Sequence, residues 1–301
     1  MAFDLAKSLV IGVSSRALFD LSHEDGIFQD KGLGAYEAFQ LANESKVLSP
    51  GAAFPLIQAL LSLNSRFEDK RPVEVIIMSR NSAETSLRIF NSIQHYDLDI
   101  SRAALTGGAP LAPYLSSFNI SLFLSQHEED VESAIEAGFP AAILYALPEN
   151  PLSKIDEIRI AFDGDAVLFS EDSERIYQEQ GLEAFLKHET QNAKNPLPEG
   201  PFAKLLRALA FIQSECNGAT PKIRTALVTA RAGPAQERVI RTLRTWGIDI
   251  NEAFFLGGVQ KGAVLKAFGA HMFFDDHRGH CEDAAQYVPT GRVPAKVRKI
   301  R

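Results

Sequence analysis

The feature that most constrains the fold is an internal repeat. The stretch VEVIIMSRNSAETSLRIFNSIQHYDLDISRAALTGG begins at Val73 and aligns without a gap with IRTALVTARAGPAQERVIRTLRTWGIDINEAFFLGG, which begins 150 residues later at Ile223. Both copies end in a pair of glycines. A repeat of this kind is typical of chains built from related structural units. The sequence therefore predicts two fused, degenerate copies of one unit, in residues 1–150 and 151–301.

Short apolar runs that alternate with helical patterns define the predicted elements. The predicted strands are Leu9–Val13, Val75–Met78, Leu122–Leu124 and Ala141–Tyr145 in the first copy, and Ile158–Phe162, Ala226–Val228 and Met272–Phe274 in the second. Helical apolar spacing covers, among others, Ala83–Tyr96 and Ala235–Trp246. Strands that alternate with helices predict βαβ units. We expect an α/β fold with doubly wound, mainly parallel sheets.

The two copies differ most where polar residues follow the predicted strands. In the alignment Asp163 faces Ser14, Asp165 faces Arg16, Thr229 faces Ser79, Lys261 faces Leu111, and Asp275-Asp276 face Ser125-Gln126. The acidic residues are thus confined to the second copy. Because ligands of open α/β sheets bind beyond the carboxyl ends of the strands, we expect these side chains to converge at one sheet edge. Any catalytic chemistry then belongs to the second copy.

Four carboxylates that converge at one edge repel each other unless a cation neutralises them. Oxygen ligands suit a hard cation, so the predicted cofactor is Mg²⁺. Beside a phosphate monoester, one carboxylate can attack phosphorus and a second can transfer the proton of the leaving group. A hydroxyl and a lysine can hold the phosphoryl oxygens as charge moves. The pattern predicts a metal-dependent site for phosphoryl transfer.

The DGDAV motif at Asp163, the isolated Thr229, Lys261 and the FFDD motif resemble the haloacid-dehalogenase phosphatase superfamily. By this resemblance Asp163 is the nucleophile and Asp165 is the acid/base. Phosphate would bind to Thr229 and Lys261. The Mg²⁺ ligands that the resemblance implies are Asp163, the main-chain carbonyl of Asp165, Asp275 and Asp276.

Three longer blocks resemble a narrower group, the cytosolic 5′-nucleotidase I family, whose members prefer AMP. The blocks are VSSRALFDL from Val13, RNSAETSLRIFNSIQHYDLDISRAALTGG from Arg80, and FLKHETQNAKNPLPEGPFAKLL from Phe185. The resemblance implies Mg²⁺-dependent hydrolysis of nucleoside 5′-monophosphates. Two positions depart from the family pattern: Gln260 stands where proline is expected, and His277 follows the acid pair where glutamine is expected. Both neighbour the predicted site and could shift substrate preference.

Residues 170–222 separate the first two motifs of the second copy. Ser170–Lys187 and Pro201–Glu215 have helical apolar spacing, and the Pro/Gly-rich NPLPEGP joins them. An insert at this point would lie over the strand edge. We expect a small helical cap that excludes water and contacts the nucleoside.

Two groups of residues keep more than one interpretation. Arg231 either binds phosphate or only pairs with a surface acid. The polar residues at the first-copy edge either complete the sheet or bind the base or an effector nucleotide; they are Ser14, Ser15, Arg16, Arg80 and Asn81. We favour the ligand role, because hydroxyls, an amide and cations at a strand edge suit an anion.

Composition limits the partners. A formal net charge of −7 disfavours a nucleic-acid polymer, and no apolar run approaches the roughly 20 residues that a membrane span needs. The two cysteines, Cys216 and Cys281, form no disulfide framework and fit a reducing compartment, and the N-terminus lacks a signal-peptide pattern. We therefore expect a cytoplasmic enzyme with a nucleoside monophosphate as substrate; a nucleotide effector and a homo-oligomer stay open.

Two alternative functions stay open as well. One is a phosphatase for another small phosphomonoester, such as a phosphosugar. The other is a nucleotide-binding regulator without turnover. The pair Asp163 and Asp165 disfavours the regulator, because binding alone does not need the second carboxylate.

Overall fold

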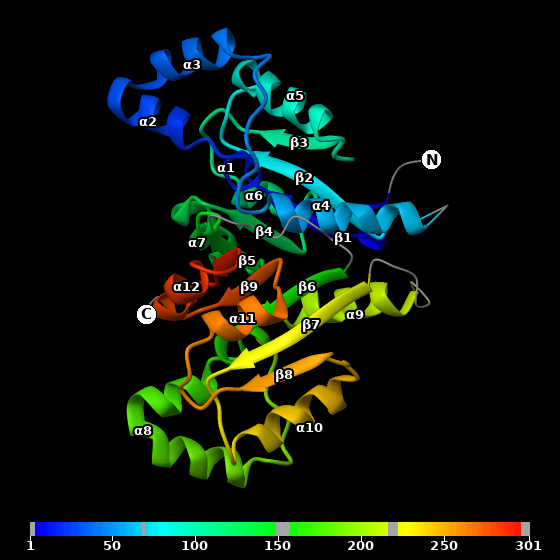
Figure 1. Cartoon of the computed structure of the whole chain (residues 1–301), viewed down its shortest axis with the longest axis vertical. Coiled ribbons are helices and arrows are strands. Elements are labelled where there is room, and N and C mark those ends of the chain that lie inside the picture. The colour runs from blue at the N-terminus through cyan, green and yellow to red at the C-terminus, as the bar shows by residue number, and fades with distance from the viewer. Residues whose placement is uncertain (1–3, 68–69, 149–156, 216–221, 296–301) are drawn as a thin grey trace. The chain divides into compact units, whose positions relative to one another are not determined.

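The computed structural model describes residues 4–67, 70–148, 157–215 and 222–295. The chain divides into two compact units (Figure 1). Unit 1 extends to Ala146, and unit 2 runs from Leu147 to Ala295. The boundary predicted between residues 150 and 151 lies outside the described residues, as does Cys216.

Unit 1 contains a parallel β-sheet and the helices that connect its strands. The strands are β1 (Leu9–Val13), β2 (Val73–Ser79), β3 (Arg102–Leu105), β4 (Leu122–Ser125) and β5 (Ala141–Leu144). The helices are α1 (Ser15–Leu18), α2 (Ser22–Lys31), α3 (Leu33–Ala42), α4 (Phe54–Ser62), α5 (Leu87–His95), α6 (Ala112–Leu115) and α7 (Glu128–Glu136), with 3₁₀ turns at Leu5–Lys7, Leu63–Arg66 and Glu84–Ser86. The strand order is β3-β2-β1-β4-β5, and every neighbouring pair is parallel.

Unit 2 has the same arrangement of strands. They are β6 (Glu157–Phe162), β7 (Lys222–Thr229), β8 (Glu252–Phe255), β9 (Met272–Asp275) and β10 (Thr290–Arg292). The helices are α8 (Asp172–Gln191), α9 (Ala203–Glu215), α10 (Gln236–Trp246), α11 (Gly262–Phe268) and α12 (Arg278–Ala284). The order is β8-β7-β6-β9-β10, again with parallel neighbours. The predicted α/β class and the mainly parallel sheet are confirmed.

The central strands lie in the core of each unit. Every residue of β1 and β2 is buried, as expected for a parallel sheet that helices cover on both faces. In unit 2 the rings of Phe162 and Phe274, on neighbouring strands, stack with centroids 5.8 Å apart, and both are fully buried. Phe162 immediately precedes Asp163 at the end of β6, and Phe274 immediately precedes Asp275, the last residue of β9. The site residues are therefore held by a rigid apolar layer.

Several short elements were not predicted from the sequence. The strands β3, β8 and β10 were missed, because β3 and β8 contain no buried position and β10 has only three residues. The predicted helix Ser170–Lys187 overlaps α8, which begins at Asp172, ends at Gln191 and is interrupted at Gly181. None of the helices in the described ranges combines the length and apolar character that crossing a membrane requires.

Between the first two strands of unit 1, the helices α2 and α3 meet at Gly32 and are tied to α5 by an arginine. The backbone angles of Gly32 (φ 78°, ψ −178°) recur 149 residues later at Gly181 (φ 80°, ψ −179°), where α8 breaks. In unit 1, Arg88 of α5 donates to Glu24 of α2 at 2.5 Å and approaches Gln40 of α3 at 3.5 Å. One carboxylate thus neutralises this buried arginine.

In unit 2 the corresponding arginine also pairs with a buried acid, but this acid lies on the second of the two helical segments instead of the first. Arg238 of α10, the counterpart of Arg88, donates to Glu189 in the second part of α8 at 2.9 Å. Glu189 occupies the position of Gln40, and the position of Glu24 is taken by Ser173, which donates to Glu189 at 2.9 Å. Each arginine therefore has one acid, but the acid has changed helical segments.

The tight approach of two loops gives the first prediction. A Cβ added at Gly200 would lie 2.3 Å from the carbonyl oxygen of Phe169 and 2.4 Å from that of Val167, both rigid backbone atoms. We expect Gly200→Ala to lower the free energy of unfolding by about 2 kcal/mol or more, because the backbone must move. Gly26→Ala is the control, since nothing lies within 4 Å of its added Cβ and helix α2 should gain about 0.5–1 kcal/mol. Urea unfolding measures both, and a Gly200→Ala midpoint equal to wild type would contradict the expected clash.

Candidate active site

The first motif begins at the carboxyl end of β6. The amide of Asp163 donates to the carbonyl of Phe274 on β9 at 2.8 Å, so the two strand ends are joined. The chain then turns sharply through Gly164–Leu168. In this turn Asp165 has an extended ψ of 141°, and Ala166 has a left-handed φ of 59°. A left-handed alanine is strained, and such strain is found most often at functional sites.

Gly164 is required by packing and not by its backbone angles. The left-handed position of the turn falls on Ala166, whereas an added Cβ at Gly164 would lie 3.3 Å from Oγ1 of Thr229. Gly164 thus lets the turn approach the end of β7. Thr229 is buried there, and its Oγ1 accepts a hydrogen bond from the amide of Arg231 at 3.2 Å.

A single lysine links the ends of β6 and β9. Lys261 precedes α11 and is 2% exposed. Its Nζ donates to Oδ1 of Asp163 at 2.6 Å and to Oδ2 of Asp275 at 2.7 Å. Burial alone would lower the pKa of Lys261, but the two carboxylates outweigh burial and hold it above its ordinary value. The ammonium therefore stays charged between the two acids.

Three carboxylates form a cluster around this lysine. One oxygen from each of Asp163, Asp275 and Asp276 lies within 4.8 Å of the other two. Burial, with the charges of Asp163 and Asp275, raises the pKa of Asp276 to about 8. Burial also raises the pKa of Asp163 to about 7, although Lys261 opposes the rise. For Asp275 burial acts in the same direction, but Lys261 and His280 outweigh it and bring the pKa below the ordinary value.

The cluster fits a divalent cation. Its three acids carry more negative charge than the one ammonium of Lys261 neutralises, and this repulsion adds to burial in raising the pKa values of Asp163 and Asp276. All donors in the group are carboxylate oxygens, the ligands that Mg²⁺ prefers in proteins. Asp163, Asp275 and Asp276 are the residues that could hold such an ion.

Asp165 does not belong to this cluster of side chains. Its two oxygens accept from Nε and an Nη atom of Arg231 at 2.7 and 2.6 Å, a bidentate ion pair. Arg231 also donates to Glu189, which Arg238 contacts from α10. Burial would raise the pKa of Glu189, but these arginines and Ser173 hold it below its ordinary value. Arg231, predicted to bind phosphate or a surface acid, is thus engaged with two buried acids.

Glu189 and Arg238 were not recognised from the sequence as part of this region. The available signal was that Arg238 and Arg88 align in the repeat, which marks an arginine used in both units. Its acid could not be found in the same way, because Glu189 aligns with Gln40. The acid lies on a different helical segment in each unit, so aligning the two copies does not reveal it.

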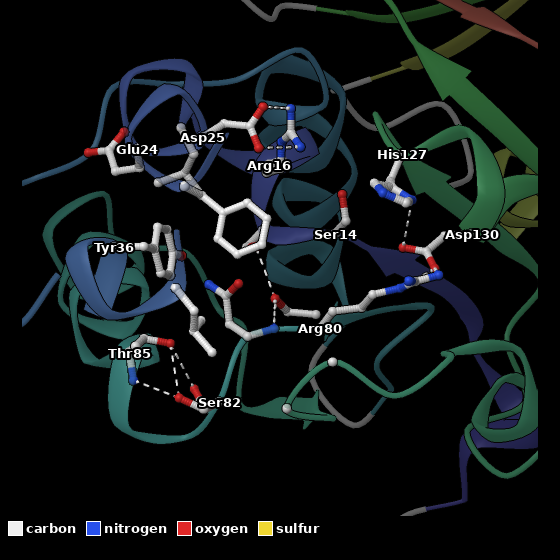
Figure 2. A pocket seen from close by; sticks show the side chains of 18 of the residues that line it. Ser14, Arg16, Glu24, Asp25, Tyr36, Arg80, Ser82, Thr85, His127 and Asp130 are labelled. Atoms are coloured by element: carbon white, nitrogen blue, oxygen red, sulfur yellow. Dashed lines mark hydrogen bonds and ion pairs between the residues drawn. The ribbon is translucent and has the colours of Figure 1, made fainter. Parts of the chain in front are cut away.

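The predicted first-copy residues line a cavity in unit 1. Its volume is about 490 Å³, and the residues singled out from the sequence all contribute to its lining: Ser14, Ser15, Arg16, Arg80 and Asn81. Figure 2 shows Arg16 paired with Asp25, and Arg80 paired with Asp130. These residues come together at the carboxyl ends of β1 and β2, as the alignment predicted.

The raised pKa of Asp276 leads to a prediction about pH. A carboxyl group with a folded pKa near 8 keeps its proton in the folded protein after the unfolded chain has released it. Stability without metal should therefore fall as the pH rises from about 5 to 7.5. Asp276→Asn removes this group and should make the fall shallower, whereas Asp249→Asn, at an exposed position, should leave it as in wild type. Urea midpoints in EDTA give the slopes; equal slopes for all three proteins would contradict the assignment.

Comparisons with known proteins agree with this geometry. A 5′-nucleotidase family profile matches residues 1–300. Among curated proteins, cytosolic 5′-nucleotidase 1B from Homo sapiens is 38% identical over 287 residues, which cover 92% of this chain and 47% of the relative. The chain thus spans about half the length of that relative. No solved structure matches. Since the family match extends over nearly the whole chain and includes all the clustered carboxylates, this chain belongs to the 5′-nucleotidase family.

Proposed function

We propose that the chain hydrolyses nucleoside 5′-monophosphates of the AMP type to nucleoside and phosphate, in a Mg²⁺-dependent reaction. The observation that carries the proposal is the cluster of Asp163, Asp275 and Asp276 around Lys261 at two neighbouring strand ends, in a member of the 5′-nucleotidase family. The substrate class agrees with the name of the human relative. Bound Mg²⁺ would neutralise charge on the acids and on the phosphoryl oxygens.

The chemistry that we propose has two steps. An oxygen of Asp163 bonds to phosphorus while the bond from phosphorus to the ribose 5′ oxygen breaks, and Asp165 gives that oxygen a proton. Water then attacks the aspartyl-phosphate, and Asp165 takes the proton of the water as phosphate leaves. We propose that Lys261 and the hydroxyl of Thr229 hold phosphoryl oxygens during both steps, which is supported by the contact of Lys261 with Asp163 and by the closeness of Thr229 to Gly164.

The ion pair between Asp165 and Arg231 adds a condition to this mechanism. Both oxygens of Asp165 accept from Arg231, so the pair must open before Asp165 can reach the leaving oxygen and exchange a proton with it. A phosphate dianion would compete with Asp165 for Arg231. We propose that substrate binding moves Arg231 from Asp165 to phosphate, which combines its predicted phosphate-binding role with the pairing seen here.

We also propose that α8 and α9 act as a cap in unit 2 and that the two units are degenerate copies, of which only the second is catalytic. The cap is supported by Glu189 of α8, which reaches Arg231 at the end of β7. The loss of catalysis in unit 1 is supported by Ser14 and Ser125, hydroxyl residues at the positions of Asp163 and Asp275. A cytoplasmic location is proposed from the composition and the relative's name.

The proposal is tested by phosphate release from a panel of nucleoside monophosphates and phosphosugars, with Mg²⁺ or with EDTA. We expect release from AMP-type substrates only with Mg²⁺. Faster release from phosphosugars would favour a different phosphatase, and no release from any compound would favour a binding protein without turnover.

Asp163→Asn tests the nucleophile. The amide nitrogen and oxygen cannot form the acyl phosphate, so phosphate release should fall on the order of a thousandfold or more. The exposed Asp249→Asn is the matched control and should keep the wild-type rate. Rates are measured with AMP at saturating Mg²⁺, and folding is checked by circular dichroism. A correctly folded Asp163→Asn protein with normal turnover would remove Asp163 from the mechanism.

Asp275→Asn tests the metal site without relying on turnover. Mg²⁺ that binds only the folded protein raises its melting temperature. The wild type should therefore show a higher melting temperature in Mg²⁺ than in EDTA, and Asp275→Asn should lose most of that difference, because one carboxylate of the cluster is gone. The same Mg²⁺-induced shift in both proteins would show that the ion binds elsewhere.

A further inference from the structure

The cavity of unit 1 has the size of a small-molecule site and offers few free charges. At about 490 Å³ it falls within the usual range for ligand pockets. Its charged lining residues are Arg16, Arg80, Glu24, Asp25, Glu37 and Asp130, and Glu24 is already paired with Arg88 outside the lining. Both arginines are already paired, as Figure 2 shows. An added phosphate would have to displace Asp25 or Asp130 from its arginine.

The floor of the cavity is formed by hydroxyl groups instead of acids. Ser14, Ser79 and Ser125 lie at the ends of β1, β2 and β4, the positions that Asp163, Thr229 and Asp275 hold in unit 2. Oγ of Ser14 accepts from the amide of Ala17 at 3.2 Å, and Oγ of Ser125 accepts from that of His127 at 3.0 Å. A hydroxyl that accepts in this way keeps its proton to donate. The floor is therefore neutral and able to bond a polar ligand.

One amide group in the lining is incompletely satisfied. Nδ2 of Asn81 is buried and makes no hydrogen bond of normal geometry among the described residues, and its nearest polar neighbour is the hydroxyl of Tyr36, which also lines the cavity. A buried polar nitrogen that is incompletely satisfied is costly, so a ligand acceptor placed beside it would be bound favourably. The amide thus adds a specific recognition group to the neutral floor.

Aromatic and aliphatic side chains form the outer wall. The rings of Phe28 and Tyr36 meet edge to face with centroids 6.1 Å apart, and Phe28 is 43% exposed. Leu33, also in the lining, is 58% exposed. An exposed aromatic face at a cavity mouth favours a flat ring as its occupant. The wall selects an aromatic ligand, while the floor selects hydroxyl or carbonyl groups.

We propose that this cavity binds an uncharged nucleoside, the class of product that the unit 2 reaction releases. The flat base would lie against Phe28 and Tyr36, and base or sugar groups would bond to Asn81 and the serine floor. The choice of a nucleoside among flat, hydroxylated molecules rests on the proposed function. The preference for an uncharged ligand over a nucleotide effector rests on the two lining arginines, which Asp25 and Asp130 already neutralise.

Direct binding tests this proposal in the full chain. Adenosine and AMP are titrated calorimetrically in EDTA, which also removes metal from the unit 2 cluster. Phe28→Ala is compared with Tyr177→Ala, because Tyr177 is the counterpart of Phe28 in unit 2 and packs on Phe185 with the same edge-to-face geometry at 6.2 Å. Asn81→Ala gives a second reading should Phe28→Ala fail to fold.

We expect an adenosine-binding component that Phe28→Ala or Asn81→Ala weakens about tenfold or more and Tyr177→Ala leaves unchanged. That component should bind AMP more weakly than adenosine. Absence of adenosine binding, a component lost with Tyr177→Ala instead, or tighter binding of AMP would each overturn the proposal. Phosphate release by the wild type is measured in parallel, so that failure of the hydrolase proposal can be told apart from failure of this one.

Discussion

The contact of Lys261 with Asp163 and Asp275 is the interaction on which the site depends. Two neighbouring strands end in acids that a buried apolar layer holds in place, and repulsion between them is offset by one enclosed ammonium. Unit 1 lacks both the acids and the lysine at the corresponding positions. Where the strand ends carry serines, the position of the lysine is taken by Leu111, which is buried in the apolar core. The acids and their counter-charge have thus changed together between the two units.

A second set of charges connects the turn Gly164–Leu168 to α8 and α10. Asp165 pairs with Arg231, Arg231 contacts Glu189 of α8, and Glu189 also receives Arg238 of α10. Each charged group is buried and has an opposite charge as partner, which is the condition under which burial of ions is tolerated. Movement of α8 therefore cannot leave the turn unaffected, because Glu189 and Asp165 share one guanidinium.

Much of the site could be predicted, because it consists of charged residues directly after apolar runs, a pattern that has few structural explanations. Asp163, Asp275 and Lys261 meet as the parallel-strand argument requires. What could not be predicted depends on geometry that the residue types do not specify. The left-handed residue of the turn is Ala166. Gly164 has a different role, because its lack of a side chain allows the close approach of Thr229. β10 was missed because three residues of mixed character, TGR, have no periodicity to detect.

The change of acid position around Arg88 and Arg238 has an evolutionary consequence. Glu24 serves the first arginine from α2, and Glu189 serves the second from the later part of α8. Recombination that transferred only one helical segment between the halves would combine Glu24 with Glu189, or Gln40 with Ser173. In unit 1 the first product places two carboxylates beside Arg88, and in unit 2 the second leaves Arg238 without an acid. Only an exchange of both segments together keeps one acid for each of these arginines.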